Sequence, residues 1–116
     1  MVLASAVSMT VVWSVPSKEA QSMMAALQSL LRDTRPQPGC EGCQLTSEIG
    51  DVVVIRYSER WQSEPDLRRQ VRSPRFATLA ELIERGIERP IVEFALPDGV
   101  RGIEYADEVR RPGLAG

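Results

Sequence analysis

The alternation of apolar and polar positions marks the start of the chain as a β-strand. Between residues 5 and 15, Val7, Met9, Val11 and Trp13 share one phase, whereas Ser8, Thr10 and Val12 share the other. A period of two with β-branched residues is typical of a strand. Pro16 ends this strand, because proline has no N–H to donate to a sheet, and Ser17 can cap the helix that follows. Apolar residues then recur at helical spacing, and the helix they predict has a buried stripe of Ala20, Met23, Met24, Leu27, Leu30 and Leu31.

A hairpin is expected in the middle of the chain. Two extended segments, residues 40–48 and 52–61, are separated only by the three residues Ile49–Asp51. So short a connection that contains a glycine favours antiparallel pairing of its two strands.

Serine residues mark the starts of two further helices. Ser63 is followed three residues later by Asp66, which is the pattern of a capping box. Ser73 precedes Pro74, and proline is favoured in the first position of a helix. We therefore expect one short helix after Ser63 and a second helix after Ser73.

The last part of the chain alternates again. It predicts a strand over residues 87–96, a turn at 97–99 and a further strand over 100–109. The tail, residues 111–116, is expected to be frayed.

The predicted order is β-α-β-β-α-β with one added strand. It indicates a single domain over residues 1–116 of the α+β class, with the ferredoxin-like split β-α-β topology, an antiparallel sheet and an extra C-terminal strand. Both helices of that topology cover the same face of the sheet. The strand at residues 52–61 nevertheless carries apolar residues on both phases, so the other face needs cover. A homodimer that packs sheet against sheet would supply it.

Composition narrows the possible functions. The chain has 116 residues, a formal net charge of −2 and no histidine. Such a charge gives no general attraction to nucleic acid or to an anionic membrane, and no apolar run is long enough to span a bilayer. The apolar N-terminus lacks the charged region of a signal peptide, so we expect a cytoplasmic protein. Without histidine, His-based acid–base catalysis and His-containing metal sites are excluded.

Cys40 and Cys43 form a C-x-x-C pair with three open interpretations. A redox disulfide is one, although such pairs normally begin a helix that lowers a thiol pKa, and this pair leads into a strand. A zinc site is the second, for which a symmetric dimer would have to supply the other two ligands. The third and favoured interpretation is two reduced residues that pack at the entrance of a strand.

The block from Gly39 to Phe76 resembles the antibiotic-biosynthesis monooxygenase superfamily of dimeric α/β-barrel proteins. The resemblance is carried by Pro38–Cys40 at the second strand, by Glu59–Trp61 at the end of the third, by Leu67, and by the Ser73–Phe76 helix start. It extends over roughly residues 4–96. The chain differs from many members in two ways: residues 67–72 contain no histidine, and the hairpin loop is short. Since heme-degrading members use a histidine as iron ligand, we do not expect that activity.

The resemblance implies a cofactor-independent monooxygenase acting on a small aromatic or quinol-type substrate, with no metal and no other cofactor. Trp61, which the family motif places beside the cavity, and Glu59, on the same strand face, are the predicted catalytic donor and base. The predicted substrate-binding residues are Arg56, Arg60, Tyr57, Trp13 and Phe76. Each also has a purely structural interpretation, as core, interface or surface ion-pair residue. Two alternatives of other classes remain open: a non-catalytic dimer that binds a small hydrophobic ligand, which the missing helical histidine favours, and a structural dimer without a ligand.

Overall fold

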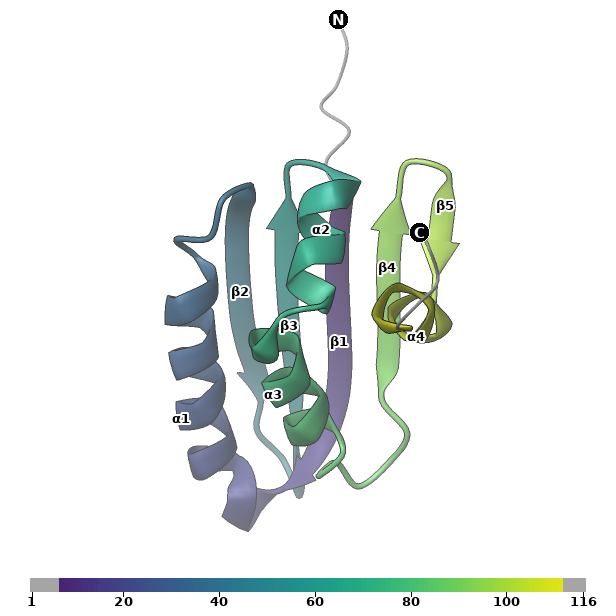
Figure 1. Cartoon of the computed structure of the whole chain (residues 1–116). Helices are drawn as coiled ribbons and strands as arrows, with labels where there is room; N and C mark the ends of the chain where they lie inside the picture. The colour runs from purple at the N-terminus through teal and green to yellow at the C-terminus, as the bar shows by residue number, and fades with distance from the viewer. Residues whose placement is uncertain (1–6, 112–116) are drawn as a thin grey trace, which may run out of the picture.

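The computed structural model describes residues 7–111, which form one antiparallel sheet with all helices on a single face (Figure 1). The elements in chain order are β1 (Val7–Pro16), α1 (Ser17–Thr34), β2 (Cys40–Glu48), β3 (Val52–Trp61), α2 (Glu64–Val71), α3 (Pro74–Ile83), β4 (Ile91–Leu96), β5 (Gly99–Arg101) and α4 (Glu104–Arg110).

The strands lie in the order β2-β3-β1-β4-β5, and every neighbouring pair is antiparallel. The first four strands have the ferredoxin-like arrangement that the sequence predicts, and the β2–β3 hairpin is confirmed. The sheet of the described chain is open rather than closed into a barrel. Its edges are β2 and the short strand β5.

The predicted caps at Ser63 and Ser73 are confirmed, whereas Ser17 is the first residue of α1 and Pro16 is in the capping position of that helix. The Ser63 hydroxyl accepts the backbone N–H of Asp66 at the start of α2, and the Ser73 hydroxyl accepts the N–H of Phe76 at the start of α3. Each cap satisfies one of the backbone donors that the first turn of a helix leaves unpaired. The two helices therefore begin where these residues place them, over β1 and β3 (Figure 1).

The predicted C-terminal strand over residues 100–109 is wrong in its greater part. Only β5 is extended, and the chain then turns into helix α4. The reason is burial: Tyr105, Ala106 and Val109 lie at helical spacing and are all buried against the rest of the fold. Strand β4 is also shorter than predicted, because it begins at Ile91 rather than at residue 87.

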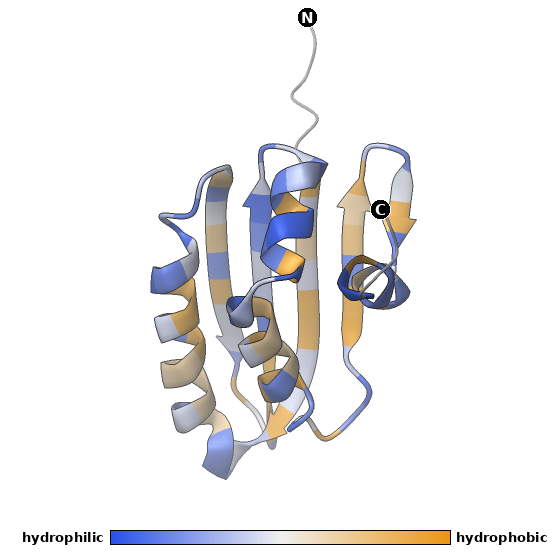
Figure 2. Cartoon of the chain, in the orientation of Figure 1, coloured by the Kyte–Doolittle hydropathy of each residue, from blue (hydrophilic) through white to orange (hydrophobic). Residues whose placement is uncertain are grey.

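The core lies between the sheet and the helices. Alternate residues of β1 and β3 point to the helices and are buried, and hydrophobic and hydrophilic positions alternate along the strands in Figure 2. The opposite face, which we call the outer face, carries a mixture of residues. Val12 lies there between Arg56 of β3 and Ile91 of β4, and the side chain of Ile91 is 61% exposed.

Two further findings concern the ends and the helices. Most of the tail that was expected to be frayed, residues 112–116, lies outside the described residues. Within residues 7–111, no helix combines the length and the apolar character that crossing a bilayer requires.

Candidate functional site

A buried carboxylate lies on the inner face of β3. Alternation along this strand turns Tyr57, Glu59 and Trp61 toward the helices, and all three side chains are buried. Glu59 is only 1% exposed. Its Oε2 accepts the Tyr57 hydroxyl at 2.7 Å, and its Oε1 accepts the Trp61 indole N–H at 3.0 Å. The expectation that Glu59 and Trp61 share a strand face is thus confirmed.

Helices α1 and α2 complete this cluster. The Gln70 side-chain amide donates to Glu59 Oε2 at 3.3 Å and lies 3.5 Å from the Thr34 hydroxyl. Arg75 in turn donates to the Gln70 side-chain oxygen at 3.0 Å. The carboxylate therefore receives three hydrogen bonds in a dry environment, as a buried polar group must. We call Thr34, Tyr57, Glu59, Trp61 and Gln70 the Glu59 cluster.

Burial raises the pKa of Glu59 above its usual value, because the charged form loses its hydration. The hydrogen bonds from Tyr57, Trp61 and Gln70 act in the opposite direction but do not offset this cost. Burial also raises the pKa of Tyr57, and the neighbouring carboxylate of Glu59 adds to this shift. The phenol therefore stays protonated and remains a donor to Glu59.

The two cysteines lie next to this cluster. Cys40 pairs across the sheet with Trp61, and Cys43 pairs with Glu59. Both are free thiols, and their sulfur atoms lie 3.7 Å apart. Within residues 7–111, no three histidine, cysteine, aspartate or glutamate side chains come close enough to hold a metal ion.

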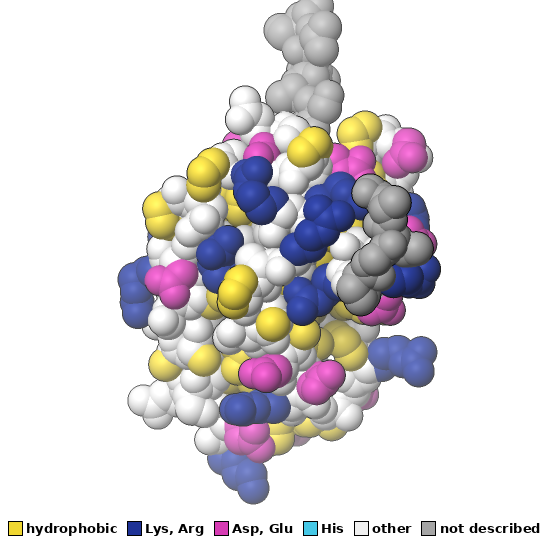
Figure 3. All heavy atoms as spheres, viewed as in Figure 1, with side chains coloured by type: hydrophobic (Ala, Val, Ile, Leu, Met, Phe, Trp, Pro, Cys, Tyr) yellow, Lys and Arg dark blue, Asp and Glu magenta, His cyan; other side chains and the backbone are white. Residues whose placement is uncertain are grey.

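A separate pocket of about 510 Å³ opens on the helical face between α3, β4 and α4. Its buried or half-buried lining is apolar and consists of Phe76, Ala80, Ile83, Pro90, Val92 and Ala106, with the exposed Ile103 beside them. Four exposed charged residues complete the rim, namely Glu84, Arg89, Asp107 and Arg110. Figure 3 shows this face of the molecule, with arginine side chains gathered over α2 and acidic side chains over the far end of α3.

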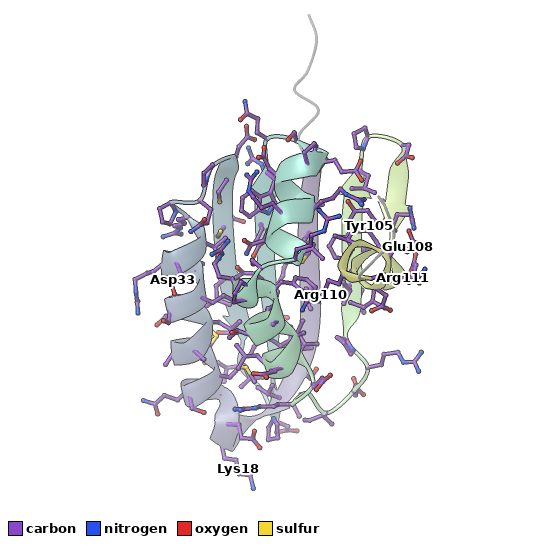
Figure 4. All side chains as sticks on the ribbon, viewed as in Figure 1. Lys18, Asp33, Tyr105, Glu108, Arg110 and Arg111 are labelled. Carbon is purple, nitrogen blue, oxygen red and sulfur yellow. The ribbon has the colours of Figure 1, made fainter. Side chains whose placement is uncertain are left out.

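Helix α4 is held in place by hydrogen bonds to α2. The Tyr105 hydroxyl donates to a Glu64 carboxylate oxygen at 2.8 Å, and Arg110 donates to the backbone oxygen of Val71 at 2.6 Å. The guanidinium of Arg110 also lies 5.8 Å from the centre of the Phe76 ring. Figure 4 shows Tyr105 and Arg110 on this helix. The wall of the pocket is therefore a fixed part of the fold.

The predicted site residues fall into four places. Tyr57, Glu59 and Trp61 meet in the Glu59 cluster, whereas Phe76 lines the pocket. Trp13 is buried in the core, and its indole N–H has no hydrogen-bond partner among residues 7–111. The remaining two are the arginines of β3, which lie exposed on the outer face.

These two arginines are Arg56 and Arg60. Their register on β3 turns them away from the helices, and Arg60 forms an ion pair with Glu41 at 3.6 Å. They lie on the opposite side of the sheet from both the pocket and the Glu59 cluster. Neither arginine is among the residues that line the pocket.

Sequence reasoning missed Gln70 and Thr34, which come from helices far apart in the chain. It also missed Asp107 and Arg110, since residues 100–109 were expected to be a strand. A signal for the latter was present: Tyr105, Ala106 and Val109 have helical spacing.

Comparison with known proteins identifies the family. The model of the family described as antibiotic biosynthesis monooxygenase matches residues 6–82, which is most of the chain. The chain belongs to this family. Among curated proteins, no relative matches the sequence.

Several solved structures share the fold. A conserved protein from Methanosarcina mazei Go1 is 21% identical, covers 78% of this chain and 91% of its own, and has a TM-score of 0.69. A Nitrosomonas europaea protein provisionally named an antibiotic biosynthesis monooxygenase is 11% identical over 83% and 93% of the two chains, also at a TM-score of 0.69. A protein of the same provisional name from Caulobacter crescentus CB15 is 19% identical. The match covers 78% of this chain and 88% of that protein, with a TM-score of 0.67. At sequence identities this low, the similarity shows a common fold.

Proposed function

We propose that this protein is a cofactor-independent monooxygenase that oxidises a small aromatic or quinol-type substrate in the pocket between α3, β4 and α4. The observation that carries the proposal is this pocket, in a chain of the antibiotic biosynthesis monooxygenase family. Its volume of about 510 Å³ lies within the range of small-molecule sites. An apolar floor with a charged rim suits a flat aromatic body that carries one ionisable hydroxyl.

In such a reaction the substrate itself supplies the electrons. Anthrone, as an example, loses a proton to give an electron-rich anion that reduces O₂. One oxygen atom then enters the ring as a carbonyl, giving anthraquinone, and the other leaves as water. The protein has to exclude water, accept the proton and stabilise the anion.

Residues that line the pocket carry out these three tasks. The ring of Phe76 and the side chains of Ile83 and Val92 form the dry surface. Asp107 lines the pocket and accepts the substrate proton, while Arg110 lies on the same rim and stabilises the anion. The role predicted for Glu59 as the base stays a prediction, since this carboxylate already receives three hydrogen bonds and does not line the pocket.

A screen of anthrones and quinols for O₂ consumption, with product identified by mass spectrometry, tests the proposal. We expect turnover in the presence of a chelator. Asp107→Asn should lower kcat by a factor of about 10² or more if Asp107 is the base. Glu81→Gln is the matched control, since Glu81 is exposed on α3 and does not line the pocket.

The screen also separates the two candidate bases. Loss of activity in Glu59→Gln and Trp61→Phe, with Asp107→Asn unaffected, would move the reaction to the Glu59 cluster. No turnover of any substrate by the wild-type protein would refute the enzymatic proposal.

A second candidate function is supported by the position of the charges. Every ionisable residue that lines the pocket is exposed at its rim, and the buried lining is wholly apolar. This arrangement also suits a non-catalytic protein that binds a small hydrophobic ligand. Ligand binding in calorimetry without any O₂ uptake would support this second function over the first.

The proposal includes a homodimer formed through the outer face. Val12 and Ile91 lie there opposite each other on β1 and β4, and Ile91 is mostly exposed. Val54 lies on the same face of β3, opposite Ser14. Contact with a second sheet would remove this apolar surface from water. We expect light scattering to give a dimer for the wild type and for Gln28→Glu, an exposed position on α1. Val54→Glu should give a monomer, and a monomeric wild type would contradict the proposal.

A further inference from the structure

A β-bulge brings the two cysteine sulfurs onto the same face of the sheet. Residues three apart on a regular strand point to opposite faces. Here Cys40 pairs with Trp61 and Cys43 with Glu59, while the pair between them joins Gly42 to Arg60 and leaves Glu41 as the extra residue. Both sulfurs consequently lie on the inner side, 3.7 Å apart.

The two thiols differ in their surroundings. Cys40 is half-buried and is the more exposed of the two residues, whereas Cys43 is only 4% exposed. Burial raises the pKa of the Cys43 thiol, and the carboxylate of Glu59 raises it further. Arg35 donates to the backbone oxygen of Cys43 at 3.1 Å and fixes this end of β2. The pair thus consists of a more exposed thiol with a protonated partner held beside it.

We propose that Cys40 and Cys43 are a reversible oxidation site, which a hydroperoxide converts into an intrachain disulfide. In the first step the thiol of Cys40 attacks hydrogen peroxide, the O–O bond breaks, and a sulfenic acid and one water molecule form. In the second step the Cys43 sulfur attacks the sulfenic sulfur, the S–O bond breaks, and the hydroxyl leaves with the Cys43 proton as a second water. The two thiols lose two electrons in total, and the peroxide is reduced to water.

The geometry favours this product over other oxidised forms. The sulfurs have to approach by about 1.7 Å to reach the length of a disulfide bond. No strand has to change its pairing, because both side chains already point to the same side. A partner at this distance captures a sulfenic acid before a second peroxide oxidises it irreversibly. The bulge therefore has a chemical consequence, since in a regular strand, with Glu41 paired like its neighbours, the two sulfurs would face opposite sides of the sheet.

The experiment treats the full-length native protein with excess hydrogen peroxide, in the absence of any aromatic substrate. Free thiols are then alkylated, and the intact mass and the peptide that carries both cysteines are analysed. The chain has two cysteines. We expect the free-thiol count to fall from two per chain to none, with a loss of two hydrogens, and to return to two after dithiothreitol. In spectra of the same sample, the indole N–H signal of Trp61 should shift, because Trp61 pairs with Cys40.

Two single variants act as matched controls. Cys43→Ser should give a sulfenic acid at Cys40 that dimedone traps, and no intrachain disulfide. Cys40→Ser should leave Cys43 unmodified under the same conditions, since this thiol is buried. Both tests use thiol chemistry alone, so their outcome is independent of whether the protein is an oxygenase.

Three results would overturn the proposal. They are two thiols that stay free in peroxide, oxidation of Cys40 to a sulfinic acid while Cys43 stays free, and a disulfide that joins two chains instead of closing within one.

Discussion

Replacement of Glu59 by glutamine tests whether the ionised form of this buried carboxyl group lowers the stability of the fold. The side chain is 1% exposed, and burial raises its pKa above the ordinary value of 4.5. Over the pH range between these two pKa values, the folded chain keeps a proton that the unfolded chain has released. Stability must therefore decrease as the pH rises through this range.

The size of the effect follows from linkage. One carboxyl group contributes a slope of at most about 1.4 kcal/mol per pH unit, beginning near pH 4.5 and ending at the pKa of the folded state. Below this range Glu59 is protonated in both states, and the variant is the less stable protein. Its amide presents N–H donors where the carboxyl oxygens accept from Tyr57, Trp61 and Gln70, and one unpaired buried donor costs about 1–3 kcal/mol. This deficit of Glu59→Gln should shrink as the pH rises.

Urea unfolding of both proteins, at a series of pH values on either side of 4.5, measures this difference directly. Titrations of other groups are common to the two proteins and cancel. Glu81→Gln is the matched control, because Glu81 is exposed on α3, away from the outer face, and we expect its difference from wild type to be independent of pH. Parallel stability curves for wild type and Glu59→Gln would refute the reasoning, as would a deficit that grows with pH.

Three further substitutions test the local structure. Ser63→Ala removes the cap of α2 and should lower the free energy of unfolding by about 0.5–2 kcal/mol in urea, whereas an unchanged midpoint would show that the cap is dispensable. Gly39→Ala puts a side chain at a φ of +84° and against the Asp66 carboxylate, so it should lower the thermal midpoint, and a midpoint equal to wild type would contradict the strained geometry. Tyr105→Phe removes the hydrogen bond to Glu64, and amide exchange in α4 should accelerate while exchange in β1 and β3 stays slow; uniform protection would refute the role of this bond.

The sheet and its first three helices could be predicted because their signals are local. The alternation in β1 and β3, the short hairpin loop and the caps at Ser63 and Ser73 each depend on residues close in sequence. Helix α4 was missed because it has only seven residues and its first turn has no side-chain cap, with Ile103 in the capping position. The stripe of Tyr105, Ala106 and Val109 decides its structure only through packing against the fold.

The candidate site could be predicted only in part, for a related reason. Glu59 and Trp61 are two residues apart on one strand, so their common face follows from the period of a strand. Gln70 and Thr34 are 36 residues apart and meet only after α1 and α2 have packed. The pocket depended on α4, so its charged rim at Asp107 and Arg110 was not foreseeable once residues 100–109 were interpreted as a strand.

The central claim is that the pocket between α3, β4 and α4 binds a small aromatic molecule. Methyl NMR spectra recorded during an anaerobic titration with anthrone test it most directly, because no turnover can then occur. We expect saturable shifts in the methyl signals of the pocket, which are those of Ala80, Ile83, Val92, Ile103 and Ala106. Leu27 is a buried residue of α1 and does not line the pocket, so its methyl signals should not shift. An unchanged spectrum, or shifts centred on Leu27 rather than on the pocket, would contradict the account.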